Sequence, residues 1–116
     1  MKVCLVNRPR DYFKLIGELA DEISVQNSSR DFDFIHFFTN KLSELEENLP
    51  VMKHQIKKDG CIWVSWYKKA SGKSSELSDQ IVRDTALAIG LVDVKVCSIS
   101  DDWSGLKLVF RIKDRS

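Results

Sequence analysis

The segment Gly60–Ser75, GCIWVSWYKKASGKSS, constrains the fold more than any other part of the chain. Its first part, Cys61–Trp66, carries no charge and is hydrophobic on both faces apart from Ser65. Such a run is typical of a strand in the middle of a parallel sheet whose two faces are covered by helices. The lysines, serines and Gly72 that follow cannot continue a core strand. We therefore expect a basic loop there, and then the start of a helix.

Segments with strand and helix patterns alternate along the rest of the chain. Leu42, Leu45, Leu49, Met52 and Ile56 recur at helical spacing, which predicts a helix that Thr39 caps and Gly60 ends. Pro50 removes a backbone donor, so we expect a kink or a restart there. Helices are also expected at Asp11–Asp21 and Ser75–Ile89, and strands at Lys2–Val6, Ile23–Val25, Phe32–Phe38, Cys61–Trp66, Leu91–Ile99 and Leu106–Ile112.

This order of elements predicts one α/β domain over residues 1–116, a Rossmann-like three-layer sandwich with about six strands. The sheet is expected to be mostly parallel, with right-handed crossovers. The short, turn-rich segment Ser100–Gly105 joins the last two strands, so these should form an antiparallel hairpin at one edge. In open sheets of this kind, ligands bind beyond the carboxyl ends of the strands, where the strand order reverses.

Composition excludes several classes of protein. The chain has 116 residues and a formal net charge of +1, which does not fit a globally basic nucleic-acid binder. No apolar run approaches the ~20 residues of a membrane span, and the N-terminus does not read as a signal peptide, so we expect a cytoplasmic protein. Cys4, Cys61 and Cys97 lie in apolar runs and are expected to be buried thiols. Without clustered ligands, neither a metal nor a cofactor is expected.

Three loops should meet at the carboxyl edge of the sheet, and each carries basic residues. They are Asn7–Arg10, Thr39–Lys41 and Tyr67–Ser75. Each loop also leads into the N-terminus of a helix, where backbone amides and the helix dipole favour anions. The alternative is that these are ordinary solvated loop residues. The resulting candidate ligand-binding residues, for a phosphate or a carboxylate, are Asn7, Arg8, Arg10, Lys41, Lys68, Lys69, Ser71 and Lys73.

The sequence offers no catalytic residue. His36 lies among apolar residues of a strand and is expected to be a hydrogen-bonded core histidine. Asp31 and Asp33 precede that strand, at the wrong edge, and no serine or cysteine has the context of a nucleophile elbow. Trp63 and Trp66 should point to opposite faces of their strand. Both are expected to be core residues rather than a stacking platform. Trp66, at the strand end beside Lys68, is the one aromatic residue that a half-open position for a ligand would suit.

Several segments resemble known proteins. DFDFIHFF, GCIWVSW and the pair LVDVKVCSI and GLKLVFRI are similar to the fourth, fifth and last two strands of the class I methyltransferase fold. The third strand of that fold and its helix have no counterpart here. WVSWYKKASG and DDWSGLKLVFR are similar to an uncharacterised family of small bacterial proteins with this reduced fold. That family commonly has proline after WVSW, where this chain has Tyr67. The resemblance implies a fold but no reaction.

The methyltransferase comparison also shows what the chain lacks. The first strand of active members leads into a glycine-rich turn, whereas this chain reads Val6-Asn7-Arg8-Pro9-Arg10. An acidic residue normally ends the second strand to bind ribose, whereas this chain has Val25-Gln26-Asn27. We therefore expect a non-catalytic module that binds a small anionic ligand or a partner protein. The alternative is an S-adenosylmethionine-dependent enzyme with an unusual cofactor pose. Nucleic-acid binding ranks last, and the oligomeric state stays open.

Overall fold

The computed structural model describes residues 2–7, 24–25 and 32–111. The predicted helix Asp11–Asp21 and the site residues Arg8 and Arg10 lie outside these ranges. The elements of the described part follow in chain order: β1 Lys2–Val6, β2 Ser24–Val25, β3 Phe32–Phe38, α2 Leu42–Gln55, β4 Ile56–Tyr67, the 3₁₀ turn η2 Lys69–Ser71, α3 Asp79–Ala88, β5 Leu91–Ser98 and β6 Trp103–Phe110.

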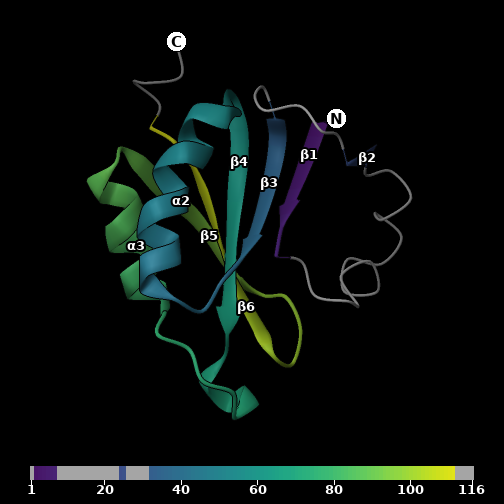
Figure 1. Cartoon of the computed structure of the whole chain (residues 1–116), viewed down its shortest axis with the longest axis vertical. Helices are drawn as coiled ribbons and strands as arrows, with labels where there is room; N and C mark the ends of the chain where they lie inside the picture. Colours follow the sequence, from purple (N-terminus) through teal and green to yellow (C-terminus); the bar gives the residue numbers. More distant parts are fainter. Residues whose placement is uncertain (1, 8–23, 26–31, 112–116) are drawn as a thin grey trace.

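The six strands form one mixed sheet in the order β2-β1-β3-β4-β6-β5 (Figure 1). β1 pairs in parallel with β2 and β3, and β3 pairs in parallel with β4. β6 runs antiparallel to both β4 and β5, which places the predicted hairpin at one edge of the sheet. The predicted α/β architecture and its six strands are therefore confirmed. The strand order reverses between β1 and β3, whose carboxyl ends lie at Val6 and Phe38.

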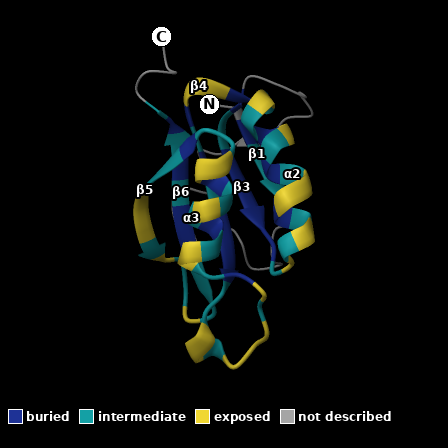
Figure 2. Cartoon of the chain, turned by 90° about the vertical axis from the view of Figure 1, so that its left-hand side faces the viewer, coloured by how far each residue is buried: buried dark blue, intermediate teal, exposed yellow. Residues whose placement is uncertain are grey.

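One face of the sheet is covered by α2 and α3, which lie side by side in front of it in Figure 1. Ile62, Val64 and Trp66 of β4 point toward these helices and belong to the main hydrophobic core. Figure 2 shows the buried surface of β3 and β4 behind the two helices. Trp63 lies on the opposite face of β4, because successive side chains of a strand point to opposite faces of the sheet. Within the described residues, the helices thus account for one of the two outer layers that the sequence predicts.

α2 is shorter than predicted and uninterrupted. It ends at Gln55, and Ile56 already begins β4, so the prediction that the helix reaches Gly60 is wrong. Pro50 lies inside the helix, and the predicted restart there does not occur. The buried side chains of Leu45, Leu49 and Met52 continue on both sides of the proline, and their contacts with the core hold the helix together across the missing N–H.

Gly60 is required by a close approach of two strands. The pairing of β3 with β4 shifts register between Phe32 and Phe34, so Lys57–Gly60 bulge out of the ladder. A Cβ atom on Gly60 would lie 2.9 Å from the carbonyl oxygen of Asp33. Only glycine leaves room for that contact. This close approach, and not the end of a helix, explains the glycine at position 60.

Ser78 caps α3 by accepting a hydrogen bond from the Ile81 N–H at 3.3 Å, as expected for a serine of that segment.

The last hairpin has a shorter connection than predicted. β6 already begins at Trp103, so Trp103–Gly105 belong to the strand and not to the linker. The Ile99 N–H donates to the Trp103 carbonyl at 2.9 Å and closes the turn.

The three cysteines are free thiols, as predicted, but they are only partly buried, so the prediction that they are buried is wrong. Burial raises the pKa of the Cys4 and Cys61 thiols. None of the described helices is long and apolar enough to cross a membrane.

Candidate functional site

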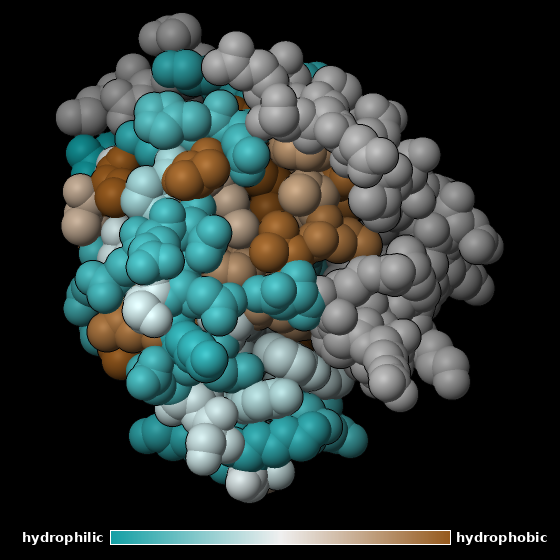
Figure 3. Space-filling view, in the orientation of Figure 1, coloured by the Kyte–Doolittle hydropathy of each residue, from teal (hydrophilic) through white to brown (hydrophobic). Residues whose placement is uncertain are grey.

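The loop that follows β4 is the most basic of the described segments at the carboxyl edge of the sheet. The Lys68 N–H donates to the Asp102 carbonyl at 2.9 Å, which ties the loop to the β5–β6 turn. The Ser71 hydroxyl donates to the Lys68 carbonyl at 2.6 Å and closes the turn η2. Gly72 then adopts a φ of +77°, the left-handed conformation that glycine tolerates best. Figure 3 shows that this end of the molecule is hydrophilic.

The lysines of this loop differ in their partners. The Lys73 ammonium lies 3.2 Å from the Asp102 carboxylate and 5.1 Å from the centroid of the Tyr67 ring. The Lys68 ammonium donates to the Ser98 hydroxyl. In the part of the chain that the structure describes, Lys69 takes part in no ion pair. A hollow of about 370 Å³ is lined by Tyr67, Lys69, Gly72, Lys73, Ser74, Ser75 and Leu77.

The N-terminus of α2 lies beside this hollow and already contacts a carboxylate of the chain itself. The Leu42 N–H donates to Oε1 of Glu76 at 2.9 Å, and the Glu76 N–H donates to the Asn40 carbonyl, also at 2.9 Å. The Asn40 side chain in turn accepts the Tyr67 N–H at 2.7 Å. Glu76 is not among the predicted site residues, and no local pattern indicates it, because its partner lies 34 positions earlier.

Lys41 lies at the same helix end. It lines a second hollow, of about 350 Å³, together with Asn40, Ser74, Ser75 and Glu76. Ser74 and Ser75 line both hollows, so the structure brings Lys41, Lys69 and Lys73 to adjoining walls. We call this surface, formed by Lys41, Tyr67, Lys69, Lys73, Ser74 and Ser75, the basic edge.

Asn7 has a different neighbourhood from the basic edge. It follows β1 with a φ of +58°, and its side-chain amide donates to the Glu44 carboxylate of α2 at 2.9 Å. In Figure 1 the loop after β4 extends beyond the carboxyl ends of β1 and β3. Of the eight predicted ligand residues, only Lys41, Lys69 and Lys73 line the two adjoining hollows within the described part of the chain. Lys68 contacts Ser98 of β5 instead, Ser71 closes the turn η2, and Asn7 contacts α2.

The aromatic residue near the basic edge is not the one that the sequence suggests. Trp66 is 5% exposed and packs in the core, as the sequence predicts, so it is not the open aromatic residue of this edge. Tyr67 lies next to the loop instead, and its ring packs on that of Trp103 with centroids 4.4 Å apart. Trp103 pairs directly with Tyr67 in the antiparallel register. The alternating pattern of β6 extends to Trp103 and indicates this pairing, whereas the turn-rich composition of Ser100–Gly105 predicts a turn there.

His36 is a core residue, as predicted. It is 2% exposed, its Nε2 lies 2.8 Å from the Ser65 hydroxyl, and its ring stacks on Phe38 with centroids 4.2 Å apart. Burial lowers the pKa of His36 to about 3, so the ring is neutral near pH 7. The neighbouring Ser65 is fully buried. This histidine–serine pair is therefore closed to a substrate.

The described residues contain no group of three or more His, Cys, Asp and Glu side chains that could hold a metal ion. The described residues that line the hollow of about 370 Å³ offer hydroxyls and ammonium groups, but no carboxylate, imidazole or thiol. Such a set of donors can bind an anion, because each ammonium offers three hydrogens and each hydroxyl one.

Several solved structures with a similar fold are methyltransferases. An S-adenosylmethionine-dependent methyltransferase from Bacteroides fragilis, in complex with S-adenosyl-L-homocysteine, matches with a TM-score of 0.64 and 10% identity over 97% of this chain and 73% of its own. Another such enzyme, from Clostridium acetobutylicum, matches with a TM-score of 0.62 and 7% identity over 94% and 83%. A TehB-like enzyme from Corynebacterium glutamicum matches with a TM-score of 0.57 and 16% identity over 94% and 67%.

At these identities the likeness shows the fold alone. This chain spans only 45% of a magnesium protoporphyrin IX methyltransferase from Synechocystis that it also matches. No curated protein matches the sequence. One family does match, over residues 14–112, which is most of the chain, and its members share the description "protein of unknown function". The chain belongs to this family, DUF3052.

Proposed function

We propose that this protein is a non-catalytic Rossmann-like module that binds a small phosphate- or carboxylate-bearing ligand at the basic edge. The observation that carries the proposal is the hollow of about 370 Å³ with Lys69 and Lys73 in its wall. Pockets for small molecules typically measure about 300–1,000 Å³, so the hollow has room for a metabolite. It lies at the carboxyl end of β4, on the side of the sheet where such folds bind ligands.

The contacts at the hollow suggest how an anion would bind. Lys69 takes part in no ion pair within the described residues, so an anion would not have to displace a carboxylate from it. Lys73 is paired with Asp102 on the surface, where ion pairs are weak and exchange readily with other partners. The hydroxyls of Ser74 and Ser75 would complete the set of donors, and the Tyr67 ring would cover one side of the ligand.

Methyl transfer is the second candidate, favoured by the fold that the chain shares with S-adenosylmethionine-dependent enzymes. The described residues at the corresponding place do not fit that cofactor. Asn7 has the positive φ that a glycine usually supplies, but its side chain extends from the end of β1 to Glu44 of α2. A side chain at this position occupies space into which a cofactor would have to approach the backbone. We therefore rank this reading below anion binding.

Calorimetric titration with nucleotides and phosphorylated metabolites tests the proposal. We expect a heat of binding with at least one phosphate-bearing compound, and we expect Lys69→Glu to abolish it while the protein stays folded. Lys95→Glu, on the exposed surface of β5, changes the net charge equally and is the matched control. Equal losses in the two variants, or silence with every compound, would remove the proposed site. Stabilisation by S-adenosylmethionine alone would favour the second candidate.

A further inference from the structure

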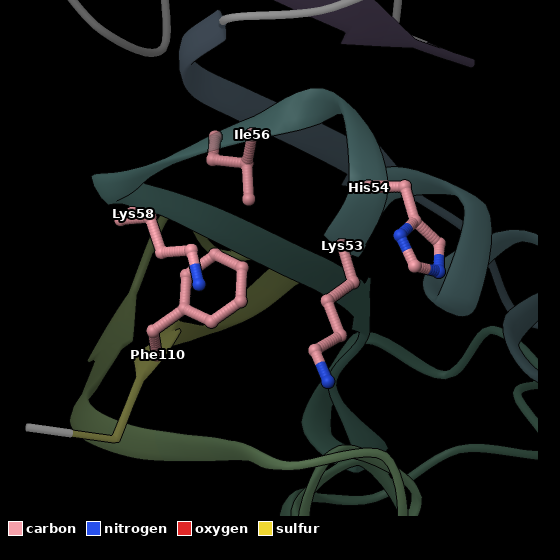
Figure 4. A pocket seen from close by; sticks show the side chains of 5 residues that line it. All are labelled: Lys53, His54, Ile56, Lys58 and Phe110. Atoms are coloured by element: carbon pink, nitrogen blue, oxygen red, sulfur yellow. The ribbon is translucent and has the colours of Figure 1, made fainter. Parts of the chain in front are cut away.

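Another basic hollow, separate from the two at the basic edge, lies at the opposite end of the sheet. It measures about 420 Å³ and is lined by Lys53 and His54 from the last turn of α2, Ile56 and Lys58 from the start of β4, and Phe110 from the end of β6 (Figure 4). This end of β4 is remote from the basic edge, which follows Tyr67 at the other end of the same strand. We call this hollow the amino-end pocket.

Two lysines of the amino-end pocket share one aromatic ring. The Lys53 ammonium lies 5.8 Å from the centroid of Phe110, and the Lys58 ammonium lies 5.5 Å from the same centroid. Phe110 is itself 7% exposed, so its position is fixed by the core. Cation–π attraction therefore places both ammonium groups at the wall that Phe110 forms.

Lys53 is positioned by a further contact. Its ammonium donates to the carbonyl of Ile89, the C-cap residue that follows α3, where the helix dipole favours a cation. An ammonium group has three hydrogens, so this bond leaves donors for a ligand. Lys53 would thus act as a pre-positioned donor, whereas the exposed Lys58 and His54 would complete the contact from the sides.

The surroundings of the amino-end pocket favour a negatively charged ligand. Among the described residues that line it, two lysines and one histidine are the polar side chains. Asp33, close by, lies 3.3 Å from the Lys57 ammonium and so already has a cation beside it. Arg111, next to Phe110, adds a further positive charge, and its guanidinium donates to the Leu87 carbonyl at 3.2 Å. Asp59 is exposed on the same bulge as Lys57 and Lys58, and its negative charge offsets part of their positive charge.

We propose that the amino-end pocket binds a small organic phosphate, with its phosphate group between Lys53, Lys58 and His54 and its organic part against Ile56 and Phe110. A tetrahedral phosphate can accept hydrogen bonds from several donors at once, which a carboxylate does less well. The volume exceeds what a bare phosphate ion fills and lies in the usual range for a metabolite site. The nearly buried side chains of Ile56 and Phe110 offer the apolar contact for the rest of the molecule.

The experiment is a titration of the full-length, isotope-labelled protein with glycerol 3-phosphate, followed by the backbone amide signals in NMR spectra. We expect the signals of Lys53–Lys58 and Phe110 to shift at millimolar concentration or below. Lys58→Gln should weaken this binding about tenfold, as expected for the loss of a charge-assisted hydrogen bond. Lys57→Gln is the matched control, since it removes a neighbouring charge that does not line the pocket, and it should change the affinity by less than about twofold.

Two outcomes would overturn this proposal. In one, the signals of the amino-end pocket do not move with glycerol 3-phosphate. In the other, Lys57→Gln weakens binding as much as Lys58→Gln, which would indicate an unspecific effect of net charge. Lys69→Glu separates this site from the basic edge, because it should leave the shifts at Lys53–Lys58 unchanged. Failure at one end of the sheet therefore does not imply failure at the other.

Discussion

The carboxylate of Glu76 accepts a hydrogen bond from the backbone N–H of Leu42, and the two atoms are 2.9 Å apart. The chain thus supplies its own anion to the N-terminus of α2, at a helix end whose N-cap residue, Lys41, makes no side-chain cap. The same contact fastens the loop after β4 to the helix. It fixes one wall of the basic edge, and it places a negative charge next to the lysines.

Replacement of Glu76 tests this double role. We expect Glu76→Ala to lower the free energy of unfolding by about 1 kcal/mol, because the helix end loses its cap. Glu76→Gln keeps a hydrogen-bond acceptor, so it should lower the free energy of unfolding by less. It should also strengthen the binding of phosphate-bearing ligands at the basic edge, because it removes a repelling charge. Urea unfolding and calorimetric titration measure the two effects. Glu47→Ala, at an exposed position of α2, is the control, and a loss of stability as large as that of Glu76→Ala would refute the cap.

The buried ring of His36 predicts a dependence of stability on pH. Its pKa in the folded protein is about 3, whereas an unfolded histidine has a pKa of about 6.5. Between these values only the unfolded chain takes up the proton. Stability is therefore complete above about pH 6.5 and falls by up to about 1.4 kcal/mol per pH unit as the pH decreases toward 3.

Urea unfolding at a series of pH values measures this slope. His36→Gln keeps a hydrogen-bonding group beside Ser65 without a titratable ring, so its stability should fall less steeply with decreasing pH. His54→Gln removes an exposed histidine and should leave the steep slope in place. If His36→Gln does not fold, the imidazole signals of His36 in NMR spectra provide the test. A titration of these signals close to pH 6.5 would contradict the neutral, buried ring.

Gly60 gives a prediction about the packing of β3 against β4. A methyl group on this residue would lie 2.9 Å from the Asp33 carbonyl oxygen and 2.9 Å from Cγ1 of Ile56. The backbone oxygen cannot move aside easily, so we expect Gly60→Ala to destabilise the protein by about 1–3 kcal/mol. At Gly105 the closest atom is the end of the Ile99 side chain, which can rotate, so Gly105→Ala should cost less. Thermal unfolding of both variants measures the difference, and the reverse order would show that the bulge is looser than described.

The sequence was sufficient for the fold where a pattern is local. The apolar run of Phe32–Phe38 and the alternation in β5 and β6 predict strands that the structure confirms. Errors arose where distant contacts decide. Ile56 continues the spacing of a helical stripe, yet its pairing with Phe32 makes it the first residue of β4. Trp103 looks like part of a turn, yet its register with Tyr67 extends β6.

The candidate site was predictable only as a set of lysines. Lys69 and Lys73 could be assigned to the loop after the central strand, because the charge pattern ends the strand abruptly. The carboxylates that lie among them could not be foreseen, since Glu76 meets α2, and Asp102 meets Lys73, only after folding. The amino-end pocket likewise combines residues from α2, β4 and β6 that share no pattern in the sequence.

The central claim is that a phosphate-bearing ligand binds in the hollow between Tyr67, Lys69 and Lys73. Mapping of amide shifts with adenosine monophosphate on the isotope-labelled protein tests it most directly. We predict that the largest shifts fall on residues 67–77 and disappear in Lys69→Glu. An absence of shifts there at millimolar ligand, or shifts centred on Val6 and Asn7 upon addition of S-adenosylmethionine, would contradict it.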